Sequence, residues 1–189
     1  LVTSREPLEL HGEWLFDVGG LATPPEGLGP QAARYDAVRL YVQQAARLTQ
    51  GRQFSAEELE EIGRLCRLLG GLPLGIELAA TWSPLLSPSE LRLEIERDPR
   101  MLVSRRRDLP ERHRSLWRVF DYTWGRLTGP ERSALMALTA FPASFGLAAA
   151  RNVTGSELAT LIRLLDLKLM RRPGVGRFEL HQLVKQYVQ

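Results

Sequence analysis

Helix-start signatures recur along this chain and constrain its fold more than any other feature. In each, a Ser, Thr or Asp stands three residues before a Glu. The oxygen of the first side chain accepts an unpaired N–H of the first helical turn, and the Glu reaches back to the N–H of the first residue. Five such pairs occur: Ser55/Glu58, Ser87/Glu90, Asp108/Glu111, Thr128/Glu131 and Thr154/Glu157. The sequence therefore predicts a mainly α fold.

Apolar residues at helical spacing extend these starts. They predict a helix near 38–48, a second that follows Ser55 and ends at Gly70 and Gly71, a short buried one over 73–82, and a fourth from Ser87 to about Arg97. Two short apolar runs, 1–3 and 15–18, favour strands. The Gly- and Pro-rich stretch between residues 19 and 30 is typical of a connector.

The last third has the order of a winged helix. Helices are predicted after Asp108 and Thr128, and a longer one runs from Thr154 to about Arg172. A turn over 173–176, a short strand over 177–180 and a final helix from His181 follow. The turn would be the wing.

Several motifs resemble those of the STAND class of signal-transduction ATPases, which includes NB-ARC proteins. Residues 71–74 read Gly-Leu-Pro-Leu, like the GLPL motif, and residues 180–182 resemble the MHD motif of the winged-helix domain. Residues 37–41 look like the first helix after the nucleotide core, and residues 1–5 look like the sensor-one strand with its Arg. Residues 77–80 are typical of bacterial members, which are often transcriptional regulators of the LuxR and AfsR type.

Two departures from this resemblance concern the MHD motif. Leu180 replaces its Met, and Gln182 replaces the Asp that the family uses to hold its closed state. The phosphate loop and the magnesium-binding acids of the family are absent from this sequence and are expected before residue 1.

The resemblance implies three nucleotide-binding residues. Pro73 would pack on the adenine, His181 would touch the β-phosphate of ADP, and Arg5 would sense the γ-phosphate. From the residues alone, Pro73 is equally a helix-start proline, His181 a capping histidine and Arg5 a surface arginine.

These observations predict three parts: a remnant of the α/β nucleotide core over 1–33, a GLPL-containing helical bundle over 34–108 and a winged-helix domain with a short β-hairpin over 109–189. By resemblance the chain is the lid and latch of an ADP/ATP switch that regulates transcription or signalling. The chain itself is expected to be non-catalytic, with Mg²⁺ bound in the full-length parent ATPase. The expected partners are the rest of the nucleotide core in cis, further copies on activation, and DNA through other domains of the parent.

Two other functions stay open. One is a DNA-binding winged helix, with a recognition helix near 156–172 that offers Arg163, Lys168, Arg171 and Arg172 to phosphates. Against it, leucines line one side of that helix, and Glu157 and Asp166 oppose phosphates. The other is a nucleotide-independent protein-interaction module that uses the arginines near 105–114, although interleaved acids there favour a solvated face.

Composition excludes some classes of protein. The single cysteine, Cys66, rules out an internal disulfide, and three scattered histidines show no metal-ligand spacing. A net charge of +3 does not require a nucleic-acid partner. With no signal peptide and no apolar run of membrane-spanning length, the expected location is the cytoplasm.

Overall fold

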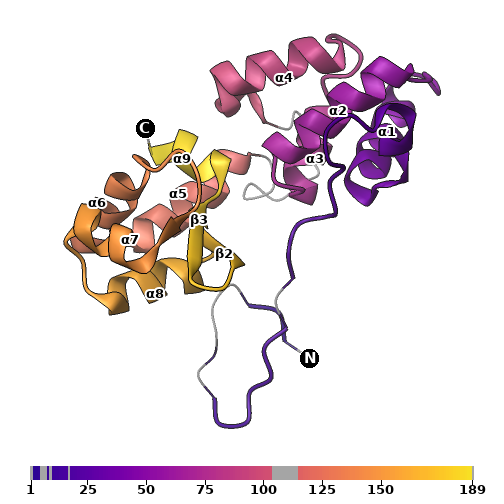
Figure 1. Cartoon of the computed structure of the whole chain (residues 1–189). Helices are drawn as coiled ribbons and strands as arrows, with labels where there is room; N and C mark the ends of the chain where they lie inside the picture. The colour runs from indigo at the N-terminus through magenta and orange to yellow at the C-terminus, as the bar shows by residue number, and fades with distance from the viewer. Residues whose placement is uncertain (1, 5–7, 9, 17, 104–114, 189) are drawn as a thin grey trace. The chain divides into compact units, whose positions relative to one another are not determined.

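The computed structural model describes residues 2–4, 8, 10–16, 18–103 and 115–188, and the chain forms two compact units (Figure 1). One unit comprises Gly19–Val119, and the other comprises Leu1–Val18 together with Phe120–Gln189. Each is described by itself. The domain boundaries expected near residues 34 and 109 stay a prediction.

The first unit, called the helical unit below, is a bundle of short helices. Its elements are η1 (Gly29–Arg34), α1 (Asp36–Leu48), α2 (Ala56–Leu68), α3 (Pro73–Ala80), α4 (Pro88–Arg97) and η2 (Pro99–Met101). Helix α1 packs on α3, and α2 packs on both α4 and η1. The buried core includes Tyr41, Ile62, Leu65, Ile76 and Leu91, each fully enclosed.

Capping boxes start three of the helices, as predicted. Ser55 and Glu58 cap α2, Ser87 and Glu90 cap α4, and Thr128 and Glu131 cap α6 (Gly129–Leu138), with both reciprocal hydrogen bonds present in each. A cap of this kind contributes about 1 kcal/mol, which matters for helices of 10 to 13 residues.

The Gly- and Pro-rich connector is bound to the helical unit. The Leu21 N–H donates to the Gly71 carbonyl oxygen at 2.8 Å. Farther along, the Glu60 carboxylate accepts from the N–H groups of Gly27 (2.9 Å) and Gly29 (2.8 Å). The Arg67 guanidinium donates to the Pro24 carbonyl oxygen at 2.6 Å. The connector is therefore a structural part of the bundle.

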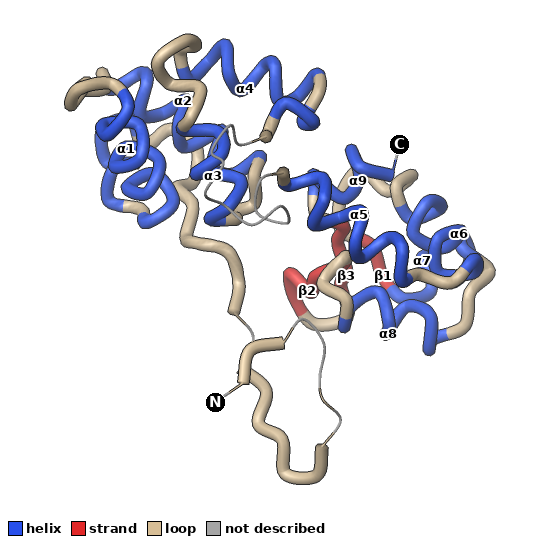
Figure 2. Tube along the Cα trace, turned by 180° about the vertical axis from the view of Figure 1, so that it is seen from behind, coloured by secondary structure: helices blue, strands red, loops and turns tan. Residues whose placement is uncertain are grey.

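The second unit has the winged-helix order. Its elements are α6, β1 (Phe145–Gly146), α7 (Leu147–Thr154), α8 (Leu158–Asp166), β2 (Met170–Gly174), β3 (Arg177–Leu180) and α9 (Gln182–Val188), preceded by α5 (Leu116–Arg126), which crosses from the helical unit. The strands form one antiparallel sheet in the order β1-β3-β2, coloured red in Figure 2. A mainly α fold with a helical bundle and a winged-helix-like hairpin is thus confirmed.

Helices and sheet share one core in this unit. Phe145 on β1 stacks on Phe141 at 4.4 Å between ring centroids and lies 6.4 Å from Phe178 on β3. Leu138 and Leu164 are fully buried on α6 and α8. Burying a leucine stabilises a fold by about 1.5–3 kcal/mol, so this core holds the hairpin against the helices.

Two predictions for this unit are wrong. Thr154 does not start a helix: it ends α7, a helix that the sequence did not predict, and its hydroxyl donates back to the Ala150 carbonyl oxygen. Gly155 then takes the left-handed conformation of a C-cap, with φ at +62°. The helix expected to reach Arg172 ends at Asp166, because Lys168 has a φ of +59° and the chain enters β2 at Met170.

The strands expected near the N-terminus do not form in the described part of the chain. Residues 2–4, 15, 16 and 18 have no strand pairing, and the sheet of the second unit contains only β1 to β3. An apolar run becomes a strand only where a neighbour accepts its hydrogen bonds. The helix start predicted at Asp108 lies outside the described residues.

Candidate functional site

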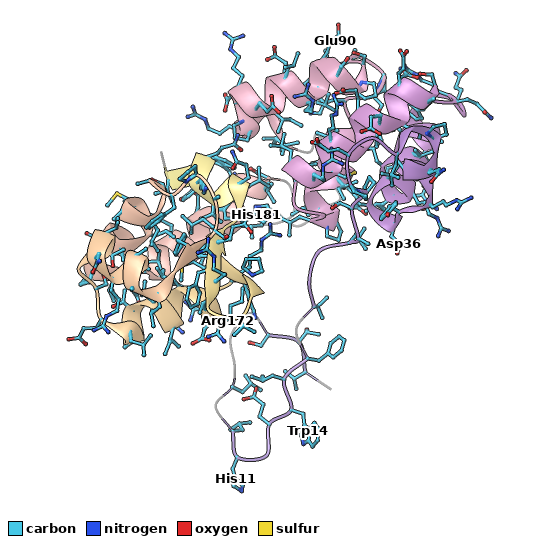
Figure 3. The ribbon with its side chains drawn as sticks, in the orientation of Figure 1. His11, Trp14, Asp36, Glu90, Arg172 and His181 are labelled. Carbon is cyan, nitrogen blue, oxygen red and sulfur yellow. The ribbon has the colours of Figure 1, made fainter. Side chains whose placement is uncertain are left out.

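His181 stands between β3 and α9 and has an unsatisfied polar atom. Its Nδ1 accepts a hydrogen bond from the Leu183 N–H at 3.2 Å, which caps the start of α9. Its Nε2 is buried and, among the described residues, has no hydrogen-bond partner. Since Nδ1 is the acceptor, Nε2 carries the proton of the neutral ring and is a donor without an acceptor. Figure 3 labels the residue.

Burial keeps this imidazole neutral. It lowers the pKa of His181 from 6.5 to about 4, the nearby Arg171 guanidinium lowers it further, and Glu179 raises it. At neutral pH the ring therefore offers one N–H donor and no charge. An imidazole in water can carry charge near neutral pH, and the burial of the His181 ring removes that property.

Pro73 is exposed at the first position of α3, after Leu72 as N-cap. The glycines before it have a structural explanation that needs no ligand. Gly71 has a φ of +68°, and a Cβ at this position would lie 2.2 Å from the Leu21 carbonyl oxygen. The Gly-Leu-Pro-Leu segment is thus where the chain near Leu21 crosses closely over the end of α2.

The three predicted nucleotide-binding residues fall in parts of the chain that are described separately or lie outside the described residues. Pro73 belongs to the helical unit and His181 to the winged-helix unit, and each is described within its own unit. Arg5 lies outside the described residues, as do the arginines at 105–107, 112 and 114. Nucleotide binding by these residues remains a prediction.

The β2–β3 hairpin, called the wing below, carries a cluster of arginines. The guanidinium of Arg171 pairs with Glu179 at 3.1 Å, and that of Arg172, labelled in Figure 3, lies 5.8 Å from the centre of the Phe178 ring. Arg177 donates to the Ser144 hydroxyl at 3.0 Å and to the Ser144 carbonyl oxygen. These contacts hold three exposed arginines on one hairpin.

Helix α8 occupies the place of a recognition helix but presents an apolar face to solvent. Leu158 and Ile162 are 45% and 43% exposed, while Leu161 and Leu164 are buried. The partly exposed Arg163 lies 4.0 Å from Glu131 of α6. Direct reading of base edges relies mainly on hydrogen-bonding side chains, which Leu158 and Ile162 do not supply.

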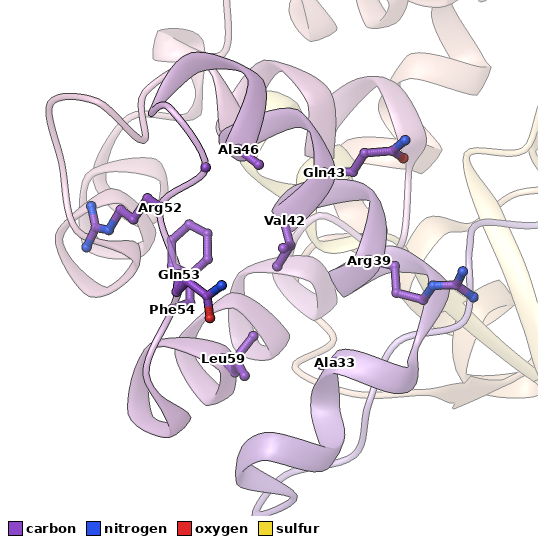
Figure 4. A pocket seen from close by; sticks show the side chains of 10 residues that line it. Ala33, Arg39, Val42, Gln43, Ala46, Arg52, Gln53, Phe54 and Leu59 are labelled. Carbon is purple, nitrogen blue, oxygen red and sulfur yellow. The ribbon is translucent and has the colours of Figure 1, made fainter.

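A further site, which the sequence did not indicate, is a pocket of about 610 Å³ inside the helical unit (Figure 4). It lies between α1 and the loop that leads to α2. Its lining residues come from η1, α1, the loop and the start of α2, so the pocket depends on the path of that loop, which local sequence patterns do not show. Its lining consists of Ala33, Arg39, Val42, Gln43, Ala46, Gly51, Arg52, Gln53, Phe54 and Leu59.

Metal and membrane sites find no support within the described ranges. Those residues contain no group of three or more His, Cys, Asp or Glu side chains that could hold a metal ion. They also form no helix with the length and apolar character needed to cross a bilayer.

Comparison with known proteins links the chain to transcription. A protein of Mycobacterium tuberculosis, which bears the provisional name of an HTH-type transcriptional regulator, is 29% identical over 197 residues. The match covers 99% of this chain and 21% of that protein, and a Mycobacterium bovis protein of the same provisional name matches equally. The chain thus spans about a fifth of the length of these relatives.

An uncharacterised protein of Mycobacterium tuberculosis is 31% identical over 157 residues, which are 83% of this chain and 37% of that protein. No family model matches the chain. No solved structure matches it either. The chain is therefore similar to one segment of longer proteins, some of them named as regulators of transcription.

Proposed function

We propose that this chain is a segment of a transcriptional regulator and that its winged-helix unit binds duplex DNA through the phosphate backbone, with the wing as the main contact. The charge of the wing carries the proposal. Residues 168–180, which are the wing and the two residues before it, contain four cationic side chains and one carboxylate. Residues 105–114 have an equal excess of positive charge but lie outside the described residues, so the wing is a positive surface of the winged-helix unit as described.

The wing arginines are held in a way that suits phosphates. A guanidinium carries five N–H donors in a planar fork and keeps its charge at any physiological pH. The contacts of Arg171, Arg172 and Arg177 are made by their guanidinium groups and use only some of these donors. Contacts to phosphates fix the position of a protein on DNA and carry no sequence information directly.

The apolar face of α8 indicates what kind of DNA binding to expect. Leu158 and Ile162 cannot pair with base edges, so the expected binding is salt-sensitive and has little sequence preference. The name of the relatives belongs to proteins about five times longer, but α7, the turn at Gly155 and α8 form a helix-turn-helix within this chain itself.

Fluorescence anisotropy with a labelled 20-base-pair duplex at several salt concentrations tests the proposal. Replacing both Arg171 and Arg172 by Gln should weaken binding and reduce the slope of log K against log[salt] by about 2. The matched control replaces Arg34 and Arg47 of the helical unit by Gln, which changes the net charge equally. Equal losses in both variants, or no binding by the unaltered chain, would contradict the proposal.

The second candidate is the nucleotide latch, and the buried Nε2–H of His181 favours it. A buried donor without an acceptor costs about 1–3 kcal/mol, and a phosphate oxygen would satisfy it. In this reading His181 donates to the β-phosphate of ADP in a longer protein that supplies the phosphate loop. That protein, purified and denatured, should release about one ADP per chain, and its His181→Ala version should release less. Release of no nucleotide from either would remove this candidate.

A further inference from the structure

We infer that the pocket between α1 and the loop before α2 binds a small organic acid with a flat apolar body. This inference does not rest on DNA binding or on the nucleotide latch, because the lining residues all belong to the helical unit and do not include Pro73. The pocket volume of about 610 Å³ is in the range of sites for drug-sized ligands.

The middle of the pocket is apolar and open. Val42 on α1 faces Phe54 and Leu59 across it (Figure 4), and all three side chains are half-buried. Ala33 and Ala46 complete this floor. Half-exposed apolar side chains gain free energy when a flat apolar group covers them.

Each end of the pocket carries an arginine that is ion-paired with a carboxylate outside the lining. Arg39 and Arg52 are the charged residues among those lining it, and they stand at opposite ends (Figure 4). Arg39 is 69% exposed and lies 3.4 Å from the exposed Asp36, a weak pairing that water screens. Arg52 donates to Glu58 through one nitrogen, and its remaining donors can reach a carboxylate. A carboxylate would find guanidinium donors at either end, whereas a cationic ligand would find no carboxylate among the residues that line the pocket.

Hydrogen bonds to the end of α1 fix the turn beside the pocket. Gln50 has a φ of +54°, an uncommon conformation for a residue other than glycine, and Gly51 follows with a φ of +82°. The Gly51 N–H donates to the Ala46 carbonyl oxygen at 3.0 Å, and the Thr49 hydroxyl donates to the Ala45 carbonyl oxygen at 2.7 Å. These bonds tie the turn to the end of α1 and hold Phe54 across from it.

The probe for this site is 2-naphthoate, with neutral 2-naphthamide as its isostere. In ¹H–¹⁵N spectra of the whole chain, 2-naphthoate should shift the amides of Val42, Phe54 and Leu59 with a Kd of about 0.1–1 mM. The amide should bind about tenfold more weakly. Absence of shifts at these residues, or equal binding of the two probes, would overturn the inference.

Two sets of variants locate the binding. Replacing Arg39 and Arg52 by Gln should weaken 2-naphthoate about tenfold, whereas Arg47→Gln, on α1 but outside the lining, should leave it unchanged. Ala46→Glu places a carboxylate in the pocket and should abolish binding of the acid, while the isosteric Ala46→Gln should retain a larger share of it. If both Ala46 variants bind as the unaltered chain does, the acid binds elsewhere and the inference fails.

Discussion

The backbones of Leu21 and Gly71 lie so close together that a side chain on residue 71 would not fit between them. The Leu21 N–H donates to the Gly71 carbonyl oxygen, and a Cβ on Gly71 would lie 2.2 Å from the Leu21 carbonyl oxygen. Gly20 repeats the relationship in the other direction, since its Cβ would meet the Gly70 carbonyl oxygen at 2.4 Å. The glycine of the Gly-Leu-Pro-Leu segment is therefore required by the fold, whatever ligand Pro73 contacts.

Gly71→Ala should destabilise the helical unit by about 2–4 kcal/mol. The positive φ costs about 1–2 kcal/mol for an L-residue, and the clash is with backbone that cannot turn aside. Urea unfolding followed by circular dichroism measures this loss. Gly125→Ala on α5 is the control, because its Cβ meets nothing within 4 Å, so the alanine should be neutral or slightly stabilising. Similar values for the two variants would contradict the role given to Gly71.

Because of Glu60, the stability of the helical unit should depend on pH in the acidic range. The N–H groups of Gly27 and Gly29 hold the pKa of its carboxylate below the ordinary value of 4.5. Because the folded pKa is the lower one, the stabilisation is present above pH 4.5 and is lost as the pH falls through the folded pKa. Glu60→Gln should flatten this part of a stability-against-pH curve. Glu57→Gln, an exposed residue on the same helix, should not.

His181 should give a second, separate pH dependence. Burial lowers its pKa to about 4, so the unfolded chain binds more protons than the folded chain between pH 6.5 and pH 4. Stability of the winged-helix unit should fall by roughly 2–3 kcal/mol across that window as the pH decreases. His181→Asn keeps an acceptor for the Leu183 N–H and should remove the dependence. His11→Asn, at an exposed position, is the control, and an unchanged curve in His181→Asn would refute the assignment.

The thiol of Cys66 should not react with thiol reagents in the folded chain. Its side chain is fully buried on α2, and burial raises the pKa of the thiol to about 12. Since the thiolate is the reactive form, a disulfide reagent such as Ellman's should react only after unfolding. One equivalent of reaction in 6 M urea and none in buffer is the expected result. Rapid reaction in buffer would show that α2 opens readily.

Sequence reasoning succeeded where structure is decided locally. A capping box needs only four consecutive residues, so Ser55, Ser87 and Thr128 marked their helices correctly. Thr154 failed although its pattern resembles that at Thr128. Gly155 takes the left-handed conformation and ends α7, whereas Gly129 is the first residue of α6, and four residues do not reveal which of the two a glycine will do. The apolar run at 15–18 failed because a strand depends on a partner that four residues do not reveal.

The candidate sites were predictable to different degrees. His181 was singled out by its motif, but the burial of its Nε2 without a hydrogen-bond partner among the described residues is a property of the folded unit that no local pattern shows. Arg171 and Arg172 were visible as charge but were assigned to a helix rather than to β2, whereas Arg177 was correctly predicted in a strand. The pocket beside Phe54 escaped notice because it depends on the turn at Gln50 and Gly51.

The anchored connector decides where this chain can be cut. A truncation at residue 34 would remove Ala32, which is fully buried, and would leave the Glu60 carboxylate and the Arg67 guanidinium without their connector partners. The same hydrogen bonds should shield residues 19–34 from limited proteolysis, despite a composition that proteases usually favour. A helical unit intended to fold by itself should therefore begin no later than Gly19. Residues 19–30, whose composition is that of a linker, have to be included.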